Sequence, residues 1–252
     1  MQHKKACNQR AAELKDKHLY SQGHERPEGH FCPICTLPIP LSLGEHSIFN
    51  TCCMKLICDG CDFAAKKRGM NDCPFCRTPN PDNHADRLAM LRARVDKKYP
   101  VAISTLGDQY YGGLLGLQRN VREAIKLWEE AAELGSIEAL HNLGVVYDCG
   151  NGVQEDNVQG IQLWTKAAMR GHVESRFNIG CHEGQKGKHD RAARHFLISV
   201  KMGHKLSLEN IKNMFMRGMA TKEQYAEALK GYQVAVAEMK SHDRDEAKKL
   251  GY

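Results

Sequence analysis

The chain has 252 residues, of which 42% are hydrophobic, so it is long and apolar enough to bury a sizeable core in more than one domain. Its net charge of +6 is dispersed: residues 31–82 contain five basic and five acidic side chains and residues 101–206 contain twelve of each, which argues against a nucleic-acid partner. No stretch approaches the roughly 18 apolar residues of a membrane span, and no apolar run follows Lys4 and Lys5 as in a signal peptide, so we expect an intracellular protein of the cytoplasm or nucleus with no membrane partner.

Residues 1–30 are predicted to form a polar helix followed by a linker. A helix over residues 4–20 places Leu14 and Leu19 on a thin apolar face. Residues 23–29 begin and end with glycine and are otherwise polar or proline, which is a composition typical of a linker.

The segment over residues 31–82 contains eight of the eleven cysteines of the chain. They form three Cys-x2-Cys pairs and one adjacent pair: Cys32/Cys35, Cys58/Cys61, Cys73/Cys76 and Cys52-Cys53. A Cys-x2-Cys turn directs two sulfurs at one ion, and four sulfurs at about 2.3 Å complete a tetrahedral zinc site. The segment has six prolines and no long helical or strand period, so it has little but metal to fold around. We therefore predict two structural zinc ions as its cofactors.

A linker helix is predicted over residues 83–99. Leu88, Leu91 and Val95 recur at helical spacing, and Pro100 separates this helix from the next domain.

Residues 100–206 repeat. Leu106-Gly107, Leu143-Gly144 and Ile179-Gly180 follow one another at intervals of 37 and 36 residues. Each pair is followed by an aromatic residue, a small pair and a glycine: Trp128, Trp164 and Phe196; Ala131-Ala132, Ala167-Ala168 and Ser199-Val200; Gly135, Gly171 and Gly203. This period predicts three helix-turn-helix units of an all-α solenoid, whose concave surface is typically a platform for peptides or proteins.

The second unit resembles a Sel-1-like repeat, a relative of the tetratricopeptide repeat. The resemblance rests on the segment Ala139-Leu-His-Asn-Leu-Gly-Val-Val-Tyr147, on Gly150-Asn-Gly152-Val153, and on Ala167-Ala168 with Gly171. It extends to the first unit, whereas in the third unit Glu183 replaces the tyrosine of the other two. The resemblance implies that the repeats bind a protein substrate or a partner in a complex.

Residues 207–252 are predicted to form capping helices at the end of the solenoid. Thr221 and Gln224 are spaced as a capping box. An apolar stripe follows at helical spacing: Tyr225, Ala228, Tyr232, Val236 and Met239. Beyond His242 the sequence is mostly charged, so we expect this end to fray.

The order of the eight cysteines resembles that of a RING finger, a module in which alternating ligand pairs hold two zinc ions in a cross-brace. The resemblance assigns the first zinc to four cysteines: Cys32, Cys35, Cys58 and Cys61. It assigns the second zinc to Cys73, Cys76 and two ligands of the central segment. The family usually has Cys-x-His-x2-Cys there, but this chain has Lys55 at the histidine position, and a protonated lysine cannot ligate zinc. Three alternatives follow: Cys52 is the fourth ligand beside Cys53, His46 is, or the second site is defective or built differently.

Three further residues match the ubiquitin ligases of the RING family. Ile34 lies between the first two ligands, Pro74 follows Cys73, and Arg77 follows Cys76. The resemblance implies that Ile34 packs on a ubiquitin-conjugating enzyme with Pro74 nearby. It also implies that Arg77 bridges that enzyme and ubiquitin through its planar fork of donors, which positions the ubiquitin thioester for attack. In a purely structural role Ile34 fills a small core, Pro74 shapes the turn and Arg77 is a solvated charge.

The sequence offers no good candidate for a catalytic nucleophile. Cys7, Cys149 and Cys181 lie at helical positions where a small buried residue is common. We therefore predict a RING-type zinc module followed by an all-α solenoid, which acts as a ubiquitin ligase by positioning and forms no covalent intermediate. The alternative is a non-catalytic zinc-and-repeat scaffold, which Lys55 favours.

Overall fold

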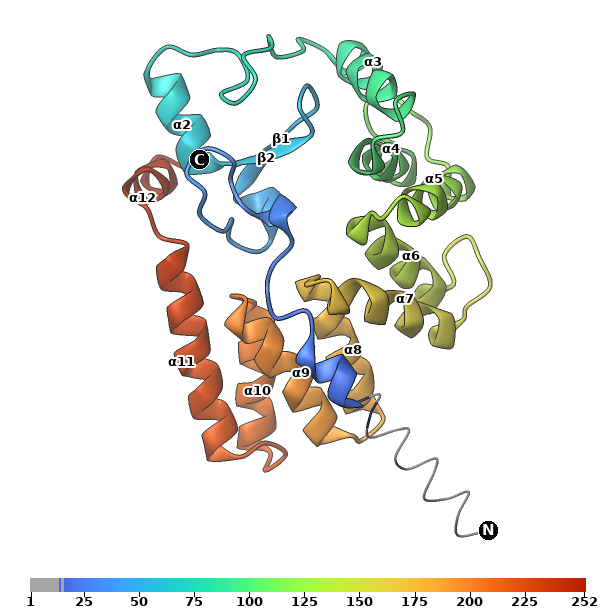
Figure 1. The fold of residues 1–252 in the computed structure, drawn as a ribbon, viewed down its shortest axis with the longest axis vertical. Helices are drawn as coiled ribbons and strands as arrows, with labels where there is room; N and C mark the ends of the chain where they lie inside the picture. The colour runs from blue at the N-terminus through green and yellow to red at the C-terminus, as the bar shows by residue number, and fades with distance from the viewer. Residues whose placement is uncertain (1–13, 15) are drawn as a thin grey trace. The chain divides into compact units, whose positions relative to one another are not determined.

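The structure is a computed structural model that describes residue 14 and residues 16–252 (Figure 1). In chain order its elements are η1 (Glu28–His30), η2 (Leu43–Glu45), β1 (Ser47–Asn50), β2 (Lys55–Cys58), α2 (Asp59–Lys67), α3 (His84–Val95), α4 (Pro100–Gly112), α5 (Val121–Glu133), α6 (Ile137–Cys149), α7 (Asn157–Met169), α8 (Val173–Gln185), α9 (His189–Lys201), α10 (Lys205–Met216), α11 (Lys222–Glu238) and α12 (His242–Lys249). Most of the helix predicted over residues 4–20 lies outside the described residues, but residues 16–21 are helical. Every helix within the described part of the chain is too short or too polar to span a bilayer.

The chain divides into two compact units. The cysteine unit comprises Pro27–Leu163 and Val234–Tyr252, and the third-repeat unit comprises the residues up to Arg26 and Trp164–Gln233. The boundaries fall within α7 and α11, so each unit contains part of both helices.

The cysteine unit begins with a small module of short elements, residues 31–82, which we call the cysteine module. β1 and β2 form an antiparallel hairpin in which Ser47 pairs with Cys58 and Asn50 with Lys55. The helix α2 follows β2 without a loop. The buried core of this module consists of cysteines together with Ile39 and Ile57, whose side chains are fully buried. The apolar core of this module is therefore very small for a segment of this length.

The helices α4 to α6 build the first part of an all-helical solenoid, as predicted. Ile103, Trp128 and Leu143 form the centre of its buried core. Trp128 lies against Gly107, where an added Cβ would be 2.7 Å from the indole Nε1. The recurring Leu-Gly pair therefore leaves room for the aromatic residue of the following helix.

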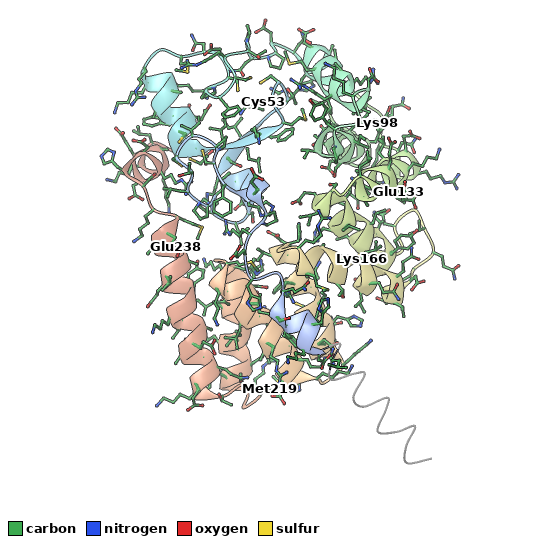
Figure 2. All side chains as sticks on the ribbon, in the orientation of Figure 1. Cys53, Lys98, Glu133, Lys166, Met219 and Glu238 are labelled. Atoms are coloured by element: carbon green, nitrogen blue, oxygen red, sulfur yellow. The ribbon has the colours of Figure 1, made fainter. Side chains whose placement is uncertain are left out.

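The helix α3 packs on this solenoid. Leu88 and Leu91 share a buried cluster with Ala102 of α4. Lys98, at the junction between α3 and α4 (Figure 2), pairs through its Nζ with the carboxylate of Glu130 in α5.

The third-repeat unit is built around the hairpin of α8 and α9. Its core contains Phe196 of α9 and Ile211 of α10. Gly180 again faces an aromatic ring, since an added Cβ would be 2.7 Å from Cε1 of Phe196. The third hairpin therefore repeats the glycine–aromatic contact of the first, with phenylalanine in place of tryptophan.

The predicted capping box at the start of α11 is confirmed. The N–H of Thr221 donates to Oε1 of Gln224 at 2.8 Å, and the N–H of Gln224 donates to Oγ1 of Thr221 at 3.2 Å. Ala228 of the predicted stripe is fully buried in the core of the third-repeat unit.

The prediction that the chain frays beyond His242 is wrong. Residues 242–249 form α12, and the hydroxyl of Ser241 caps its first turn by accepting from the N–H of Arg244 at 3.2 Å. Lys67 of α2 pairs with Glu246 of α12 at 2.7 Å, so the charges of this helix have specific partners. A charge pattern alone does not reveal partners so distant in the sequence. In Figure 1 α12 lies beside α2.

Candidate metal centre

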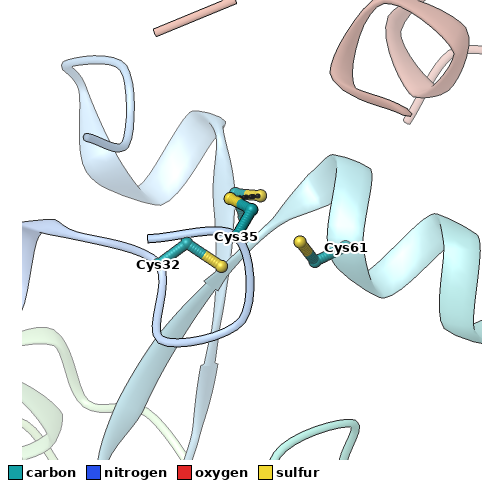
Figure 3. A group of neighbouring side chains, drawn as sticks. Cys32, Cys35 and Cys61 are labelled. Carbon is teal, nitrogen blue, oxygen red and sulfur yellow. Dashed lines mark hydrogen bonds between the residues drawn. The ribbon is translucent and has the colours of Figure 1, made fainter. Parts of the chain in front are cut away.

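The first sulfur cluster contains Cys32, Cys35, Cys58 and Cys61, whose sulfurs all lie within 4.8 Å of one another. Cys32 and Cys35 share a tight turn, in which the N–H of Thr36 donates to the carbonyl of Cys32 at 2.8 Å. Cys58 is the last residue of β2, and Cys61 lies in the first turn of α2. Figure 3 shows the sulfurs of Cys32, Cys35 and Cys61 pointing toward a common centre, and the sulfur of Cys35 is 3.8 Å from that of Cys58.

The second sulfur cluster contains Cys52, Cys53, Cys73 and Cys76, again with all four sulfurs within 4.8 Å of one another. The two adjacent cysteines lie in the turn between β1 and β2, just before Met54, whose φ is 57°. The sulfur of Cys53 is 3.8 Å from that of Cys73, and the sulfur of Cys76 is 3.3 Å from that of Cys52. Both adjacent cysteines therefore face the Cys73/Cys76 pair.

The structure places Cys52 in the second cluster, whereas His46 belongs to neither sulfur cluster of the described residues. The backbone N–H of His46 donates to the carbonyl of Leu43 at the end of η2. Lys55 is exposed at the start of β2 and pairs with Asn50 across the hairpin.

The two terminal turns of the module have the same local structure. Both read Cys-Pro-x-Cys-x-x-Pro, with isoleucine in the first and phenylalanine in the second. The residue after the second cysteine has a positive φ in each turn, 60° at Thr36 and 61° at Arg77. Its N–H donates to the carbonyl of the first cysteine, at 2.8 Å in the first turn and 2.9 Å in the second. The repeated seven-residue pattern is the sequence signal for this equivalence, which was not predicted.

The equivalent x residues of the two turns are large, apolar and exposed. Ile34 is 43% exposed and Phe75 is 45% exposed. Ile34 is therefore not a core residue of the module. Pro74 is partly buried in the second turn. The side chain of Arg77 is 61% exposed, and its Nη1 lies 4.0 Å from the carboxylate of Asp72.

The two adjacent thiols of the second cluster, Cys52 and Cys53, resist ionisation when no cation is beside them. Burial raises the pKa of the Cys53 thiol to about 11, and the nearby Cys73 adds to the shift. Burial also raises the pKa of Cys52 well above its usual range. A bound metal ion reverses this balance, because coordinated thiols are deprotonated outright.

The sulfur positions fit a tetrahedral metal site. With metal–sulfur bonds of about 2.3 Å, the edges of a tetrahedron are about 3.8 Å. The separations of Cys35 from Cys58 and of Cys53 from Cys73 are both 3.8 Å. The two clusters can therefore hold two metal ions, and four cysteine ligands leave no open position for hydrolytic chemistry.

Each cluster is approached by an arginine from outside residues 31–82. The Nη2 of Arg244 in α12 donates to the sulfur of Cys35 at 3.5 Å, and its Nη1 donates to the carbonyl of Pro38 at 2.7 Å. The Nη2 of Arg94 in α3 donates to the carbonyl of Cys52 at 2.5 Å. Sequence reasoning missed both arginines, because no spacing rule connects them to the cysteines.

The remaining cysteines lie apart from these clusters. Cys149 is exposed at the end of α6, so the expectation of a small buried residue there is wrong. Cys181 is partly buried in α8, and burial raises its pKa. Cys7 lies outside the described residues.

Comparison with known proteins identifies the helical part. The Sel1 repeat family matches residues 100–136 and 137–172. No curated protein matches the chain. Among solved structures, a Sel1 repeat protein from Oxalobacter formigenes is similar with a TM-score of 0.55 and 19% identity, over 71% of each chain.

A second similar structure is a protective antigen of uropathogenic Escherichia coli strains that displays an SLR fold. It has a TM-score of 0.54 and 21% identity over 76% of the present chain, which spans 40% of the length of that protein. At 19% and 21% sequence identity, these similarities show a shared fold and nothing about function. Residues 100–172 therefore carry two Sel1 repeats within an all-helical repeat solenoid, in a chain that also contains two cysteine clusters able to hold metal ions.

Proposed function

We propose that residues 31–82 bind two zinc ions in a RING-type cross-brace and recruit a ubiquitin-conjugating enzyme. The observation that carries this proposal is the interleaved membership of the two sulfur clusters. The adjacent pair Cys52-Cys53 lies between the two halves of the first cluster in the sequence but groups with Cys73 and Cys76. Two successive zinc fingers would keep their ligands in separate stretches of chain, whereas a cross-brace requires this alternation.

In this proposal zinc has a structural role. When bound, it keeps the thiolates ionised and cross-links loops that a small apolar core cannot hold. The module then presents Ile34 and the neighbours Pro74 and Phe75 as an apolar surface for the conjugating enzyme. Arg77 holds the thioester-linked ubiquitin in position, so that a lysine amine of the target displaces the thiolate of the conjugating enzyme. No residue of this chain forms a covalent intermediate with ubiquitin during the transfer.

The solenoid contributes a scaffold for protein–protein contacts, the general role of Sel1 repeats. In the ligase it binds the protein to be modified or holds the ligase in a complex. A non-catalytic scaffold is the second candidate. Two observations favour it: Lys55 stands at the position of the expected histidine, and α12 already occupies one face of α2.

Zinc counting and ubiquitin transfer test this proposal together. Native mass spectrometry should find two zinc ions per chain. In an autoubiquitination assay with a panel of conjugating enzymes, the wild type should form chains. Ile34→Ala and Arg77→Ala should lower the rate at least tenfold while both variants keep two zinc ions. Arg87→Ala, which removes an exposed arginine of α3, is the matched control and should retain the wild-type rate.

The possible results separate the two candidates. Two zinc ions with no transfer by any member of the panel would reject the ligase and leave the scaffold. One zinc ion or none would reject the cross-brace itself. Equal activity of Arg77→Ala and wild type would reject the positioning role of Arg77.

A further inference from the structure

The third repeat has a buried arginine where the first two repeats have an aliphatic residue. Ile103 and Leu140 occupy the position three residues before the recurring glycine-containing pair, and Arg176 occupies it in the third repeat. All three side chains are buried, and Arg176 is fully so. A charged group at such a position is costly unless other groups satisfy its donors.

The two terminal nitrogens of Arg176 donate to three main-chain carbonyls, two of which belong to the N-terminal segment. Its Nη1 donates to the carbonyl of Leu19 at 2.8 Å, and its Nη2 donates to those of Gln22 at 2.5 Å and Ala168 at 2.9 Å. Burial lowers the pKa of the guanidinium to about 10, so the group stays charged at neutral pH. Arg176 therefore fixes the end of the short helix over residues 16–21 against α7 and α8 (Figure 1).

A second apolar position of the repeat is also replaced by a polar residue. Leu127 and Leu163 precede the aromatic residue in the first two repeats, and His195 precedes it in the third. His195 is fully buried, and its Nε2 is 3.4 Å from the hydroxyl of Tyr20, with the two ring centroids 4.9 Å apart. Both departures from the repeat pattern thus contact the same N-terminal segment.

The segment itself is shaped for this contact. Gly23 has a φ of 67°, and an added Cβ would lie 1.9 Å from the carbonyl oxygen of Ala168, so only glycine fits. Asp16 pairs with Arg191 at 2.9 Å. At the other end, the guanidinium of Arg26 donates to the carbonyl of Met202 through Nε at 2.9 Å and Nη2 at 2.7 Å.

From these contacts we infer that the third repeat carries a peptide-binding site, and that residues 16–26 of the same chain are its ligand. The recognised pattern is Asp-x3-Tyr-x2-Gly-x2-Arg. In this site Arg191 binds the aspartate and His195 contacts the tyrosine. Arg176 binds main-chain carbonyls of the peptide, and the end of α7 leaves room only for the glycine. This inference does not depend on zinc binding or ubiquitin transfer. It means that a peptide with this pattern can occupy the site when the chain's own segment leaves it.

Hydrogen exchange in the full-length chain tests the intrachain contact. Arg176→Leu restores the residue type of the other repeats, so the solenoid should fold without the donors to the segment. The amides of residues 19–26 should then exchange at least tenfold faster, while those in the centre of α9 should keep their protection. Arg122→Leu, the same change at an exposed position of α5, should alter neither. Unchanged exchange of residues 19–26 in Arg176→Leu would overturn the inference.

Peptide binding in trans tests the site directly. Gly23→Ala in the full-length chain should expel the segment, because the added methyl group clashes with the carbonyl of Ala168. A fluorescent peptide of residues 16–28 should then bind the Gly23→Ala chain, measured by anisotropy, and should fail to bind the wild type at the same concentrations. Adding Arg176→Leu to the Gly23→Ala chain should weaken the binding at least tenfold.

Two results would overturn the inference. The first is an absence of peptide binding to a Gly23→Ala chain whose segment has been shown by hydrogen exchange to be released. The second is a wild-type dimer in which protection of residues 19–26 falls on dilution, because the ligand would then come from a second copy.

Discussion

At the scale of single residues, a partly buried carboxyl makes the stability of the first repeat sensitive to pH. Asp108 of α4 accepts hydrogen bonds from Nε1 of Trp128 at 3.0 Å and from Nδ2 of Asn142 at 2.8 Å. Burial raises its pKa from 3.8 to about 7, although these two donors oppose the shift. The folded chain therefore binds a proton at Asp108 that the unfolded chain releases, at any pH between these two values.

Asp108→Asn should remove this dependence on pH. Because the folded-state pKa is raised, Asp108 contributes stability that is present below about pH 4 and is lost as the pH rises toward 7. The loss should be about 2 kcal/mol, since a tenfold change in proton affinity corresponds to about 1.4 kcal/mol and the carboxyl keeps some contact with solvent. Urea unfolding at several pH values should show the stability of Asp108→Asn, relative to wild type, increasing by this amount between pH 4 and 7.5.

The comparison with wild type is needed because other carboxyl groups also affect the stability below pH 5. Asp96→Asn, at an exposed position after α3, should leave the pH profile of the wild type unchanged. A constant difference between Asp108→Asn and wild type over the whole range would show that Asp108 has the same proton affinity in both states.

At the scale of elements, α12 acts as a part of the cysteine module although it lies far from it in the sequence. Arg244 contacts the turn of Cys35 and Pro38. A side chain at Gly60 of α2 would come within 2.6 Å of the backbone nitrogen of Arg244. Tyr252 places its ring edge against Phe63 with the centroids 5.3 Å apart. In the proposed zinc site, the hydrogen bond from the guanidinium of Arg244 to the thiolate of Cys35 stabilises the thiolate charge and restricts opening of the turn.

Arg244→Ala should therefore release zinc faster from the proposed first site. Partners of this kind typically change metal affinity by about 10–100-fold, so we expect at least a tenfold higher rate of zinc transfer to a chromogenic chelator. Lys249→Ala, at an exposed position of the same helix, is the control. If zinc is released in two phases, one for each site, and only one phase is faster in Arg244→Ala, the result would fit the contact of Arg244 with one cluster alone. Equal rates in Arg244→Ala and wild type would show that α12 does not support the metal site.

These elements also show what could be predicted from the sequence. The Cys-x2-Cys pairs and the spacing of the glycine–aromatic contacts are local or periodic signals, so they predicted the grouping of the helical hairpins and drew attention to the eight cysteines. The contacts of Arg244 and Arg176 join residues 209 and 157 positions apart. Such contacts depend on how the chain returns on itself, which no local pattern records. The sequence signals for the Arg176 contact are the polar residues Arg176 and His195 at positions where the other repeats have aliphatic residues.

At the scale of the whole molecule, the apolar cores differ in whether they contain the clustered cysteines. The core of the cysteine module is made largely of the clustered cysteines. The cores around Trp128 and around Phe196 contain none of the eight clustered cysteines. Loss of metal should therefore unfold the module and leave the helical hairpins folded.

Removal of zinc with a strong chelator should accordingly have a restricted effect. Most of the far-ultraviolet circular dichroism at 222 nm should remain, because α3 to α11 lie outside the module. Amides of residues 31–82 and of α12 should lose protection from hydrogen exchange together, since α12 is held by contacts with α2 and the first turn. Cys32→Ser should reproduce this pattern without chelator, whereas Cys149→Ser, outside both clusters, should not. Cooperative loss of the helical signal on chelation would mean that the solenoid depends on the metal module, and full protection of residues 31–82 without zinc would mean that metal is not what holds them.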